Sequence, residues 1–491
     1  MKLTDKKAAF LTATLLMVLF IVILILTGDG SGCGNVTDTT EEQTTEESSD
    51  ETGETAGDDT QDLTGDENGA TEEKVKTLDA LYDNPCTGQY GIPVVAIWTD
   101  EEAFNGENGI YQTTNFYEEK ERILSFTQVY SKSGELKSAA YTNLSMHGTG
   151  SLEMDMKSMR LYYDRDLTKE ANPNRLYYNL FDDEAVDVTG QAIHSFRHII
   201  LRNGGNDNAY SMMRDLLAAK ICRNLRADVM AGQPVLVYVN GEFQGLYNAR
   251  ERFDRQYFAS HYLLEKEDVT ILEVPSPVLG VAEDARFVVA HGEEGDEEDF
   301  NDLVEYILSH DMTDSVNYEY VTDRLDVDSL IDVLCANSFF ANADWGNNNV
   351  SVWRNKGTDT SHVDNRWRFL IEDLDYSMGL VSTVNWEVVD MLMAGNSFFG
   401  QMVRALMENA EFKNDYISRY EELLATDFSY SNTIGVLQEL STQMQNVIQL
   451  NIEKWGAPAD YATWEEQVSV IRNFLKKRGS YAADHLNCYE E

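Results

Sequence analysis

Two polar segments in the second half of the sequence carry side chains suited to hold a divalent cation. The first reads Ala-Asp-Trp-Gly-Asn-Asn-Asn and contains Asp344, Asn348 and Asn349. The second reads Glu-Asp-Leu-Asp-Tyr-Ser-Met-Gly and contains Asp373 and Asp375. Carboxylates and amide carbonyls are hard oxygen ligands that suit Mg²⁺, Mn²⁺ or Ca²⁺. Alternate residues of an extended chain point to opposite faces, so the two aspartates would share one ion only if the chain turns there. Ordinary loop chemistry is the simpler interpretation.

A third segment could approach phosphate groups closely. It begins with a Gly-rich turn, His147–Ser151, and continues to the basic stretch Lys157–Arg160. Glycines permit close backbone approach and cations bind phosphate, but no Walker sequence is present. A β-turn with two exposed cations is the alternative. The candidate phosphate contacts are His147, Gly148, Lys157 and Arg160.

Glu251 is the last candidate of this kind. It would pair with Lys157 if their strands were adjacent, and a Lys–Glu pair that holds phosphates is a standard kinase device. A surface Arg/Glu stretch is the simpler interpretation, since surface ion pairs are common and mostly inconsequential.

Short strands are expected around these segments in the first half of the chain. The clearest signal is a hairpin in which Asn240-Gly241 joins Val235–Val239 to Phe243–Tyr247, because Asn-Gly is a favoured two-residue turn. Helical spacing of apolar residues predicts a helix over Tyr210–Leu225, capped by Asp207 or Asn208. The other expected strands are Pro93–Trp98, Arg122–Tyr130, Ala139–Met146, Met159–Tyr163 and His198–Leu201.

Helices dominate the pattern after about Asp299. Asp328 is expected to cap a helix that runs to about Ala341, and Arg366–Ile371 is expected as a lone strand behind it. From Ser397 to the end the pattern is helical throughout. We therefore predict an α+β domain with a mixed sheet first and a helical lobe second.

The N-terminus predicts a membrane anchor. Lys2, Lys6 and Lys7 precede an apolar run, Ala8–Leu26, that is just long enough to span a bilayer. Lysines on this side favour a cytoplasmic N-terminus. A cleaved signal peptide and a lipoprotein signal ending at Cys33 are the alternatives.

The expected organisation follows the composition along the chain. Residues from Gly34 to about Glu73 are Thr, Glu, Asp, Gly and Ser with almost nothing apolar, so they are expected to be disordered. We predict a cell-membrane, single-pass protein with an extracellular C-terminal domain. Its parts would be a cytoplasmic N-terminus (1–7), a transmembrane helix or signal anchor (8–27), an acidic linker (28–76) and a folded domain (77–491) that is sheet-rich to about 300 and helical over 300–491.

Net charge and cysteine content limit the classes of binding partner and of cysteine chemistry that the chain is expected to have. The 491 residues carry a formal net charge of −47, which argues against a nucleic-acid partner, because phosphate binding needs a basic surface. An acidic protein suits cations or basic protein substrates. No Cys-x-x-Cys pair occurs among the five cysteines, which argues against zinc and thioredoxin-type chemistry.

Taken in order, these blocks resemble the spore-coat protein H (CotH) family of atypical kinases. The resemblance covers roughly residues 93 to 380. The matching blocks are Gly109-Ile110-Tyr111, His147-Gly148 through Lys157–Leu161, Leu201–Asp207 with Arg214-Asp215, Val237–Tyr247 with Glu251, Asp344–Asn349, and Asp373–Gly379.

The resemblance implies a kinase-like, two-lobed domain that transfers the ATP γ-phosphate to Ser or Thr of surface or coat proteins, with Mg²⁺ or Mn²⁺, or Ca²⁺ as a further option. By carry-over, Asp344 would orient or deprotonate the acceptor hydroxyl. Lys157 would contact phosphate, positioned by Glu251 or another acid, with Arg160 as a second contact. The ion would be held by Asp373 and Asp375 with Asn348 or Asn349. The net charge favours a Ser-rich, basic acceptor.

Three positions depart from the family pattern. Met156 stands where the family often has a second lysine, Glu372 where it often has Trp, and Met378 where it often has an aromatic residue. These changes bear on nucleotide binding more than on metal binding. The alternatives to a kinase are a catalytically inactive CotH-fold adhesin or glycan- or protein-binding module at the cell surface, and a Ca²⁺-stabilised structural protein. The last is less favoured because no EF-hand pattern occurs.

Overall fold

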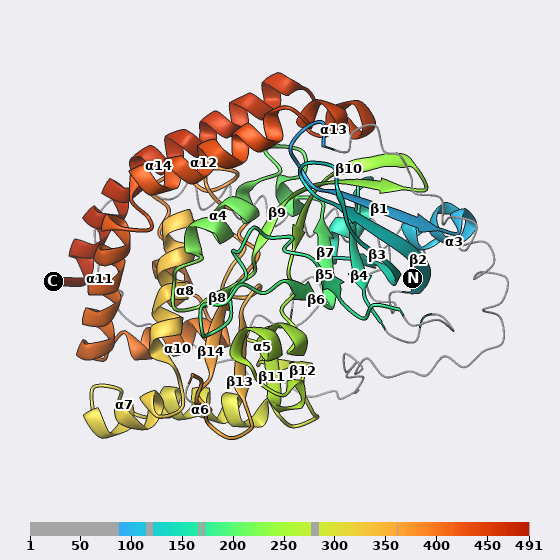
Figure 1. The fold of residues 1–491 in the computed structure, drawn as a ribbon. Coiled ribbons are helices and arrows are strands. Elements are labelled where there is room, and N and C mark those ends of the chain that lie inside the picture. The colour runs from blue at the N-terminus through green and yellow to red at the C-terminus, as the bar shows by residue number, and fades with distance from the viewer. Residues whose placement is uncertain are drawn as a thin grey trace, which may run out of the picture. The chain divides into compact units, whose positions relative to one another are not determined.

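A closed β-barrel occupies the first half of the described chain (Figure 1). The computed structural model describes residues 88–490 except 114–120, 165–166, 168–171, 276–283 and 361. All of the described residues belong to one compact unit, Glu54–Glu490. In barrel order the strands are β1 (Val94–Thr99), β2 (Arg122–Tyr130), β3 (Leu136–His147), β4 (Ser158–Tyr162), β7 (His198–Arg202), β10 (Glu242–Arg250) and β9 (Gly232–Val239).

Alternation along the strands gives the barrel an apolar face and a polar face. Met159, Leu201 and Ala249 lie side by side in the register and are fully buried, because residues of this parity fill the core. The alternate positions of the same strands, whose side chains point to the other face, include arginines instead. Arg160 and Arg250 both lie opposite Ile200 on the central strand β7, and Arg202 is two residues further along. Three arginines therefore share one face of β4, β7 and β10.

The predicted hairpin is confirmed. Strands β9 and β10 pair antiparallel around Asn240-Gly241, both with positive φ (50° and 85°), as the favoured two-residue turn requires. The Asn240 side chain also accepts a 2.9 Å hydrogen bond from the Thr99 amide on β1, which ties the turn to the barrel.

A second sheet of five strands was not predicted. Its order is β12 (Val288–His291), β11 (Val269–Glu273), β13 (Ser351–Asn355), β14 (Arg368–Ile371) and β8 (Asp228–Val229). The segment expected as a lone strand is β14, which pairs antiparallel with β13 and parallel with β8. The second half of the chain is thus not purely helical, since β13 and β14 belong to it.

Helices cover the second sheet and one side of the barrel (Figure 1). Helix α8 packs on β14 and is flanked by α11 and α14, while α13 contacts β10 of the barrel. The helices are α3 (Glu101–Asn105), α4 (Arg214–Cys222), α5 (Arg255–Tyr262), α6 (Glu298–Ser309), α7 (Ser315–Thr322), α8 (Val327–Phe340), α9 (Val388–Ala394), α10 (Phe398–Leu406), α11 (Ala410–Ala425), α12 (Tyr430–Gln445), α13 (Ile448–Trp455) and α14 (Tyr461–Glu490). The α+β class and the helical C-terminal stretch are confirmed.

Two helix ends differ from the predictions. Helix α4 begins at Arg214 rather than Tyr210, because Met212 has a positive φ of 61° that the helix cannot accommodate. Asp207 still serves the start of this helix, since its carboxylate accepts from the Met213 and Arg214 amides at 3.0 Å. Helix α8 is capped by Asp326, two residues before the expected Asp328, through the Ser329 amide.

The prediction of a single-pass location in the cell membrane is corrected. Within the ranges that the structure describes, no helix is both long enough and apolar enough to cross a bilayer. The longest, α14, carries charged side chains along its length, such as Glu465, Arg472 and Lys476. The apolar run 8–27 that led to the prediction, the N-terminus 1–7 and the linker 28–76 all lie outside the described residues.

Candidate functional site

The two polar segments proposed to hold a cation meet where α8 and β14 end. The Met378 amide donates a 2.9 Å hydrogen bond to the Phe340 carbonyl, the last residue of α8. Asn342, just beyond the helix, donates to the Asp373 carbonyl at 3.2 Å. These bonds lock the loop after α8 to the loop after β14. The chemistry-bearing residues of both segments therefore share one site.

Asp344 sits at the centre of the first loop. Its carboxylate accepts hydrogen bonds from the side-chain amides of Asn348 and Asn349, both at 3.3 Å, and Asn349 also donates to its carbonyl at 2.9 Å. Burial raises the pKa of Asp344, and the nearby charge of Asp373 raises it further. The structure thus brings together four of the predicted residues, Asp344, Asn348, Asn349 and Asp373.

Asp373 and Asp375 do face one cation, and that cation is an arginine. The chain turns at Asp373, which has a φ of 49°. As a result both carboxylates accept hydrogen bonds from the same guanidinium nitrogen, Nη2 of Arg202 on β7, with an N–O distance of 2.5 Å to Asp375. The Asp373 side chain keeps 34 % of its surface exposed, while Asp375 keeps 3 %. Only Asp373 is therefore open to a ligand.

The loop after β7 cradles Asp375. Asn206 donates to it through its backbone amide at 2.9 Å and its side-chain amide at 3.1 Å. Gly205 has a φ of +58°, and a Cβ there would lie 1.8 Å from Asp375 Oδ2, so only glycine fits. Burial, together with the charge of Asp373, raises the pKa of Asp375 to about 7. Both oxygens of Asp375 thus accept hydrogen bonds, and the carboxylate holds Arg202 and Asn206 in place.

A third carboxylate completes the network. Asp215, in the first turn of α4, pairs with Arg250 on β10 and lies 3.6 Å from Nε of Arg202. It also accepts a 3.0 Å hydrogen bond from the Leu374 amide, between the two aspartates. Burial alone would lower the pKa of Arg202, but the three carboxylates outweigh it and raise the pKa well above its ordinary value. We refer to Arg202, Arg250, Asp215, Asp373 and Asp375 as the arginine–carboxylate cluster.

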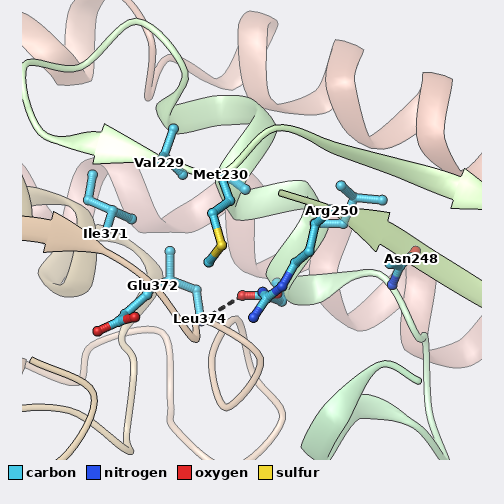
Figure 2. A pocket seen from close by; sticks show the side chains of 10 residues that line it. Val229, Met230, Asn248, Arg250, Ile371, Glu372 and Leu374 are labelled. Atoms are coloured by element: carbon cyan, nitrogen blue, oxygen red, sulfur yellow. Dashed lines mark hydrogen bonds and ion pairs between the residues drawn. The ribbon is translucent and has the colours of Figure 1, made fainter. Parts of the chain in front are cut away.

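A small pocket adjoins this cluster (Figure 2). Val229 and Met230 form part of its apolar wall, and Arg250 and Glu372 line it from β10 and from the end of β14. The hydroxyl of Ser351 donates to Glu372 at 2.5 Å. Burial nevertheless raises the pKa of Glu372 to about 7. The pocket thus holds a buried carboxyl that gains a proton far more readily than an exposed glutamate.

Lys157 lies near the proposed phosphate turn, but its ammonium group is engaged. It donates to the carbonyls of Leu152 and Met154, the second at 3.1 Å, and burial lowers the pKa of Lys157. Gly148 has a φ of +108°, and a Cβ there would lie 2.0 Å from the Ser151 hydroxyl oxygen. The glycine therefore lets the turn close tightly.

Arg160 and His147 contact each other. Nη2 of Arg160 lies 2.6 Å from Nδ1 of His147, and Nη1 donates to the Tyr162 hydroxyl at 2.9 Å. The two predicted phosphate contacts are thus neighbours on β3 and β4. Arg160 also faces Arg252, which lowers its pKa in addition to the lowering by burial.

Lys157 and Glu251 are not brought together. Strand β7 lies between their strands, and the register places Lys157 level with Tyr247, four residues before Glu251. Tyr247 confirms this alignment through a 3.1 Å hydrogen bond from its hydroxyl to the Lys157 carbonyl. Glu251 instead pairs with His261 at 2.9 Å and accepts from the Ala231 amide at 3.1 Å.

Arg202 and Arg250, the basic residues of the cluster, and its third carboxylate, Asp215, had no predicted role. Arg202 and Asp215 lie in a block that contributes only to the family resemblance, and Arg250 directly precedes the predicted Glu251. The partners could not be identified from the sequence, because the carboxylates that Arg202 binds are 171 and 173 residues away along the chain. A basic residue two positions before the paired glycines Gly204-Gly205 was the available hint.

The oxygen ligands around Asp373 suit a magnesium ion that is shared with substrate phosphates better than a metal ion that is held by protein side chains alone. Among the described residues, no group of three or more His, Cys, Asp or Glu side chains is arranged to hold a metal ion. Magnesium, however, keeps several waters and takes one or two carboxylates together with substrate phosphates. Asp373, partly exposed beside Asp344 and the amides of Asn348 and Asn349, fits that requirement. Asp375 does not, because both of its oxygens are occupied.

Comparison with known proteins places the whole site inside one family match. The sequence model of the family described as CotH kinase protein matches residues 144–482, more than half of the chain. That range contains every residue of the arginine–carboxylate cluster and all the predicted site residues. No curated protein matches the chain.

Proposed function

The chain belongs to the CotH kinase protein family, and we propose that it transfers the γ-phosphoryl group of ATP to a serine or threonine hydroxyl of a protein. The observation that carries the proposal is the meeting of the two loops, which places Asp344 beside the partly exposed Asp373. We further propose that the barrel and the helical half act as the two lobes of a kinase-like domain.

The proposed reaction needs positioning and charge neutralisation more than covalent chemistry. A bond forms between the γ-phosphorus and the acceptor oxygen, the bond to the β-phosphate oxygen breaks, and ADP leaves. The acceptor hydroxyl proton passes to Asp344, whose raised pKa suits it to receive one. Asp373 with Asn348 or Asn349 would hold the Mg²⁺ or Mn²⁺ ion, which supplies charge neutralisation at the phosphates.

The other predicted residues differ in what their contacts allow. Arg160 and His147, beside the turn at Gly148, are proposed phosphate contacts, because a buried guanidinium beside a second arginine favours an anion. Lys157 would have to release its two carbonyl partners to reach a phosphate. Glu251 supports His261 and the Ala231 amide and is a structural residue in this proposal.

Transfer from labelled ATP tests the proposal. The full-length chain is incubated with Mg²⁺ or Mn²⁺ and a Ser-containing protein, alongside Asp373→Asn, Asp344→Asn and a charge-matched control, Asp359→Asn, at an exposed carboxylate. We expect both site variants to lose on the order of a hundredfold in labelling, the scale of a lost acid–base or metal contact, and the control to be unchanged. Absence of label with either metal, or an Asp373→Asn variant as active as wild type, would contradict the proposal.

A second candidate function is a binding module that keeps the fold without catalysis. It is favoured by one observation: the Lys157 ammonium and the Asp373 carboxylate are both already engaged by protein groups. Calorimetry with ATP and Mg²⁺ separates the two. A kinase gives binding heat that Asp373→Asn reduces, whereas a pure binding module gives none in either protein.

A further inference from the structure

Two arginines face each other on a small sheet beside the barrel. Strands β5 (Leu176–Tyr177) and β6 (Ser195–Phe196) pair with Leu176 opposite Phe196. The same register places Arg175, just before β5, opposite Arg197, just after β6. Like charges directly opposite each other are destabilising. An opposing arginine pair of this kind therefore needs a negatively charged group nearby to offset the repulsion.

The charge of Arg175 is poorly compensated. In the described part of the chain it donates only long hydrogen bonds to neutral oxygens, the Ser195 carbonyl at 3.5 Å and the Gln256 side chain at 3.4 Å. Burial lowers its pKa, and the charge of Arg197 lowers it further. Arg197 has one carboxylate neighbour, Asp164, at 3.5 Å. An anion between the two guanidinium groups would relieve both.

A third arginine points to the same place. Arg252 lines a small, open pocket together with Arg175, Arg197 and His198. Its Nη1 atom is buried and has no hydrogen-bond partner among the described residues, although Asp254 lies 3.8 Å away. Buried donors are normally satisfied, so an unpaired one in a pocket indicates a missing acceptor.

The two carboxylates in this pocket are already occupied. Asp254 pairs with His198 at 2.5 Å and caps α5 by accepting from the Gln256 and Tyr257 amides. Glu251 pairs with His261. Asp254 also lies 3.8 Å from Arg252, so these carboxylates offset the three arginines only in part and at long range. In a chain with 85 acidic and 38 basic residues, this pocket is a local reversal of charge.

We propose that this pocket binds a carboxylate side chain of an acidic protein segment, and that it selects acceptors in which Glu or Asp flanks the Ser or Thr. The selection of acceptors rests on the proposed function, whereas the binding does not. Guanidinium forks match carboxylates in geometry and charge. The pocket is linked to the arginine–carboxylate cluster along the chain, since Arg252 is two residues beyond Arg250, about 7 Å in an extended chain. The basic acceptor inferred from net charge is replaced here by an acidic one.

Peptide binding without nucleotide tests the pocket alone. Two fluorescent peptides share a central Ser and differ in having Glu or Gln at the flanking positions, and fluorescence anisotropy measures their affinity for the full-length chain. We expect the Glu peptide to bind on the order of tenfold more tightly, with the difference shrinking as salt rises. Arg175→Ala should remove most of that difference and Arg175→Lys should restore part of it. Arg472→Ala, at an exposed arginine on α14, should leave it unchanged.

Labelling with ATP and Mg²⁺ then separates the two proposals. Transfer to the Glu peptide in preference to the Gln peptide, with the preference lost in Arg175→Ala, supports both. Peptide selection without any transfer overturns the kinase and leaves the pocket standing. Transfer without selection, or an Arg175→Ala variant whose preference equals that of Arg472→Ala, overturns the pocket and leaves the kinase standing. Circular dichroism checks that each variant folds.

Discussion

Replacing Arg202 by glutamine tests whether the arginine–carboxylate cluster holds the site together. The substitution removes the charge that Asp373 and Asp375 share and leaves Arg250 to serve Asp215. Removing one partner of a buried ion pair costs about 3–5 kcal/mol, because the other charge stays buried. Asp375 bears this cost fully, with 3 % of its side chain exposed. Asp373 adds about 1 kcal/mol or less, since at 34 % exposed it is better solvated.

The expected loss is therefore about 3–5 kcal/mol of unfolding free energy, a large part of the 5–15 kcal/mol typical of a folded domain. Urea unfolding of the full-length chain at pH 9 in EDTA measures it by circular dichroism, because Asp375, with a pKa of about 7, must be ionised for the full loss to appear. A double-mutant cycle with Asp375→Asn isolates the pair: the double variant should be more stable than the sum of the single losses predicts, by about 1–3 kcal/mol. Arg472→Gln serves as the control and should stay within about 0.5 kcal/mol of wild type.

Two results would refute this reasoning. One is an Arg202→Gln variant within 1 kcal/mol of wild type, by the same scale, since a buried cation that costs so little to remove is not holding the carboxylates. The other is strict additivity in the cycle, which would mean that Arg202 and Asp375 act independently despite their 2.5 Å contact.

Three further predictions concern single positions. Gly205→Ala should destabilise the chain by about 1–3 kcal/mol in urea unfolding, because the new methyl group collides with Asp375. The control Gly435→Ala in α12, where no atom lies within 4 Å of the new methyl group, should stabilise the chain by about 0.5–1 kcal/mol, and equal effects of the two substitutions would contradict this reasoning. The pKa of His261 is raised because Glu251 outweighs burial, so its stabilising charge is complete below its ordinary value of 6.5 and is lost as the pH rises through the raised pKa. The stability advantage of wild type over His261→Gln should fall from pH 6 to pH 9, and a constant or growing advantage would refute the pairing. Asn451→Ala on α13 should cost about 1–3 kcal/mol, measured the same way, because it leaves the buried Leu246 amide of β10 without its 2.9 Å acceptor; no loss would show that another group replaces it.

Local signals carried the sequence predictions that succeeded. The Asn240-Gly241 hairpin depends on turn chemistry contained within a few residues, and β2 was predicted to the residue. The second sheet failed because its pairs are remote: β8, only two residues long, pairs with β14 some 140 residues later, and no periodicity encodes that. Helix α4 was predicted too long because Met212 has a left-handed backbone conformation, which apolar spacing does not reveal.

The same contrast holds for the candidate site. The carboxylates and amides were found because their residue types are informative by themselves. Arg202 received no role because an arginine in a strand has no distinctive chemistry until its partners are known, and they come from the loop after β14. The Lys157–Glu251 pair, which required adjacent strands, does not form for a related reason: residue types suggested it, but β7 lies between the two strands and the register places Glu251 four residues beyond the position level with Lys157.

Charge within the site also argues for the kind of ion it would accept. Asp215, Asp344, Asp373 and Asp375 form a connected group of four carboxylates, and only two guanidinium groups, those of Arg202 and Arg250, pair with them in the described structure. When all four are ionised, two negative charges are uncompensated, and this excess is the reason that the pKa of both Asp344 and Asp375 is raised in addition to the effect of burial. A single divalent cation offsets that excess, and a monovalent one does not. The arginines therefore do not exclude a metal at Asp373, because they bring the site to the charge that one Mg²⁺ ion can balance.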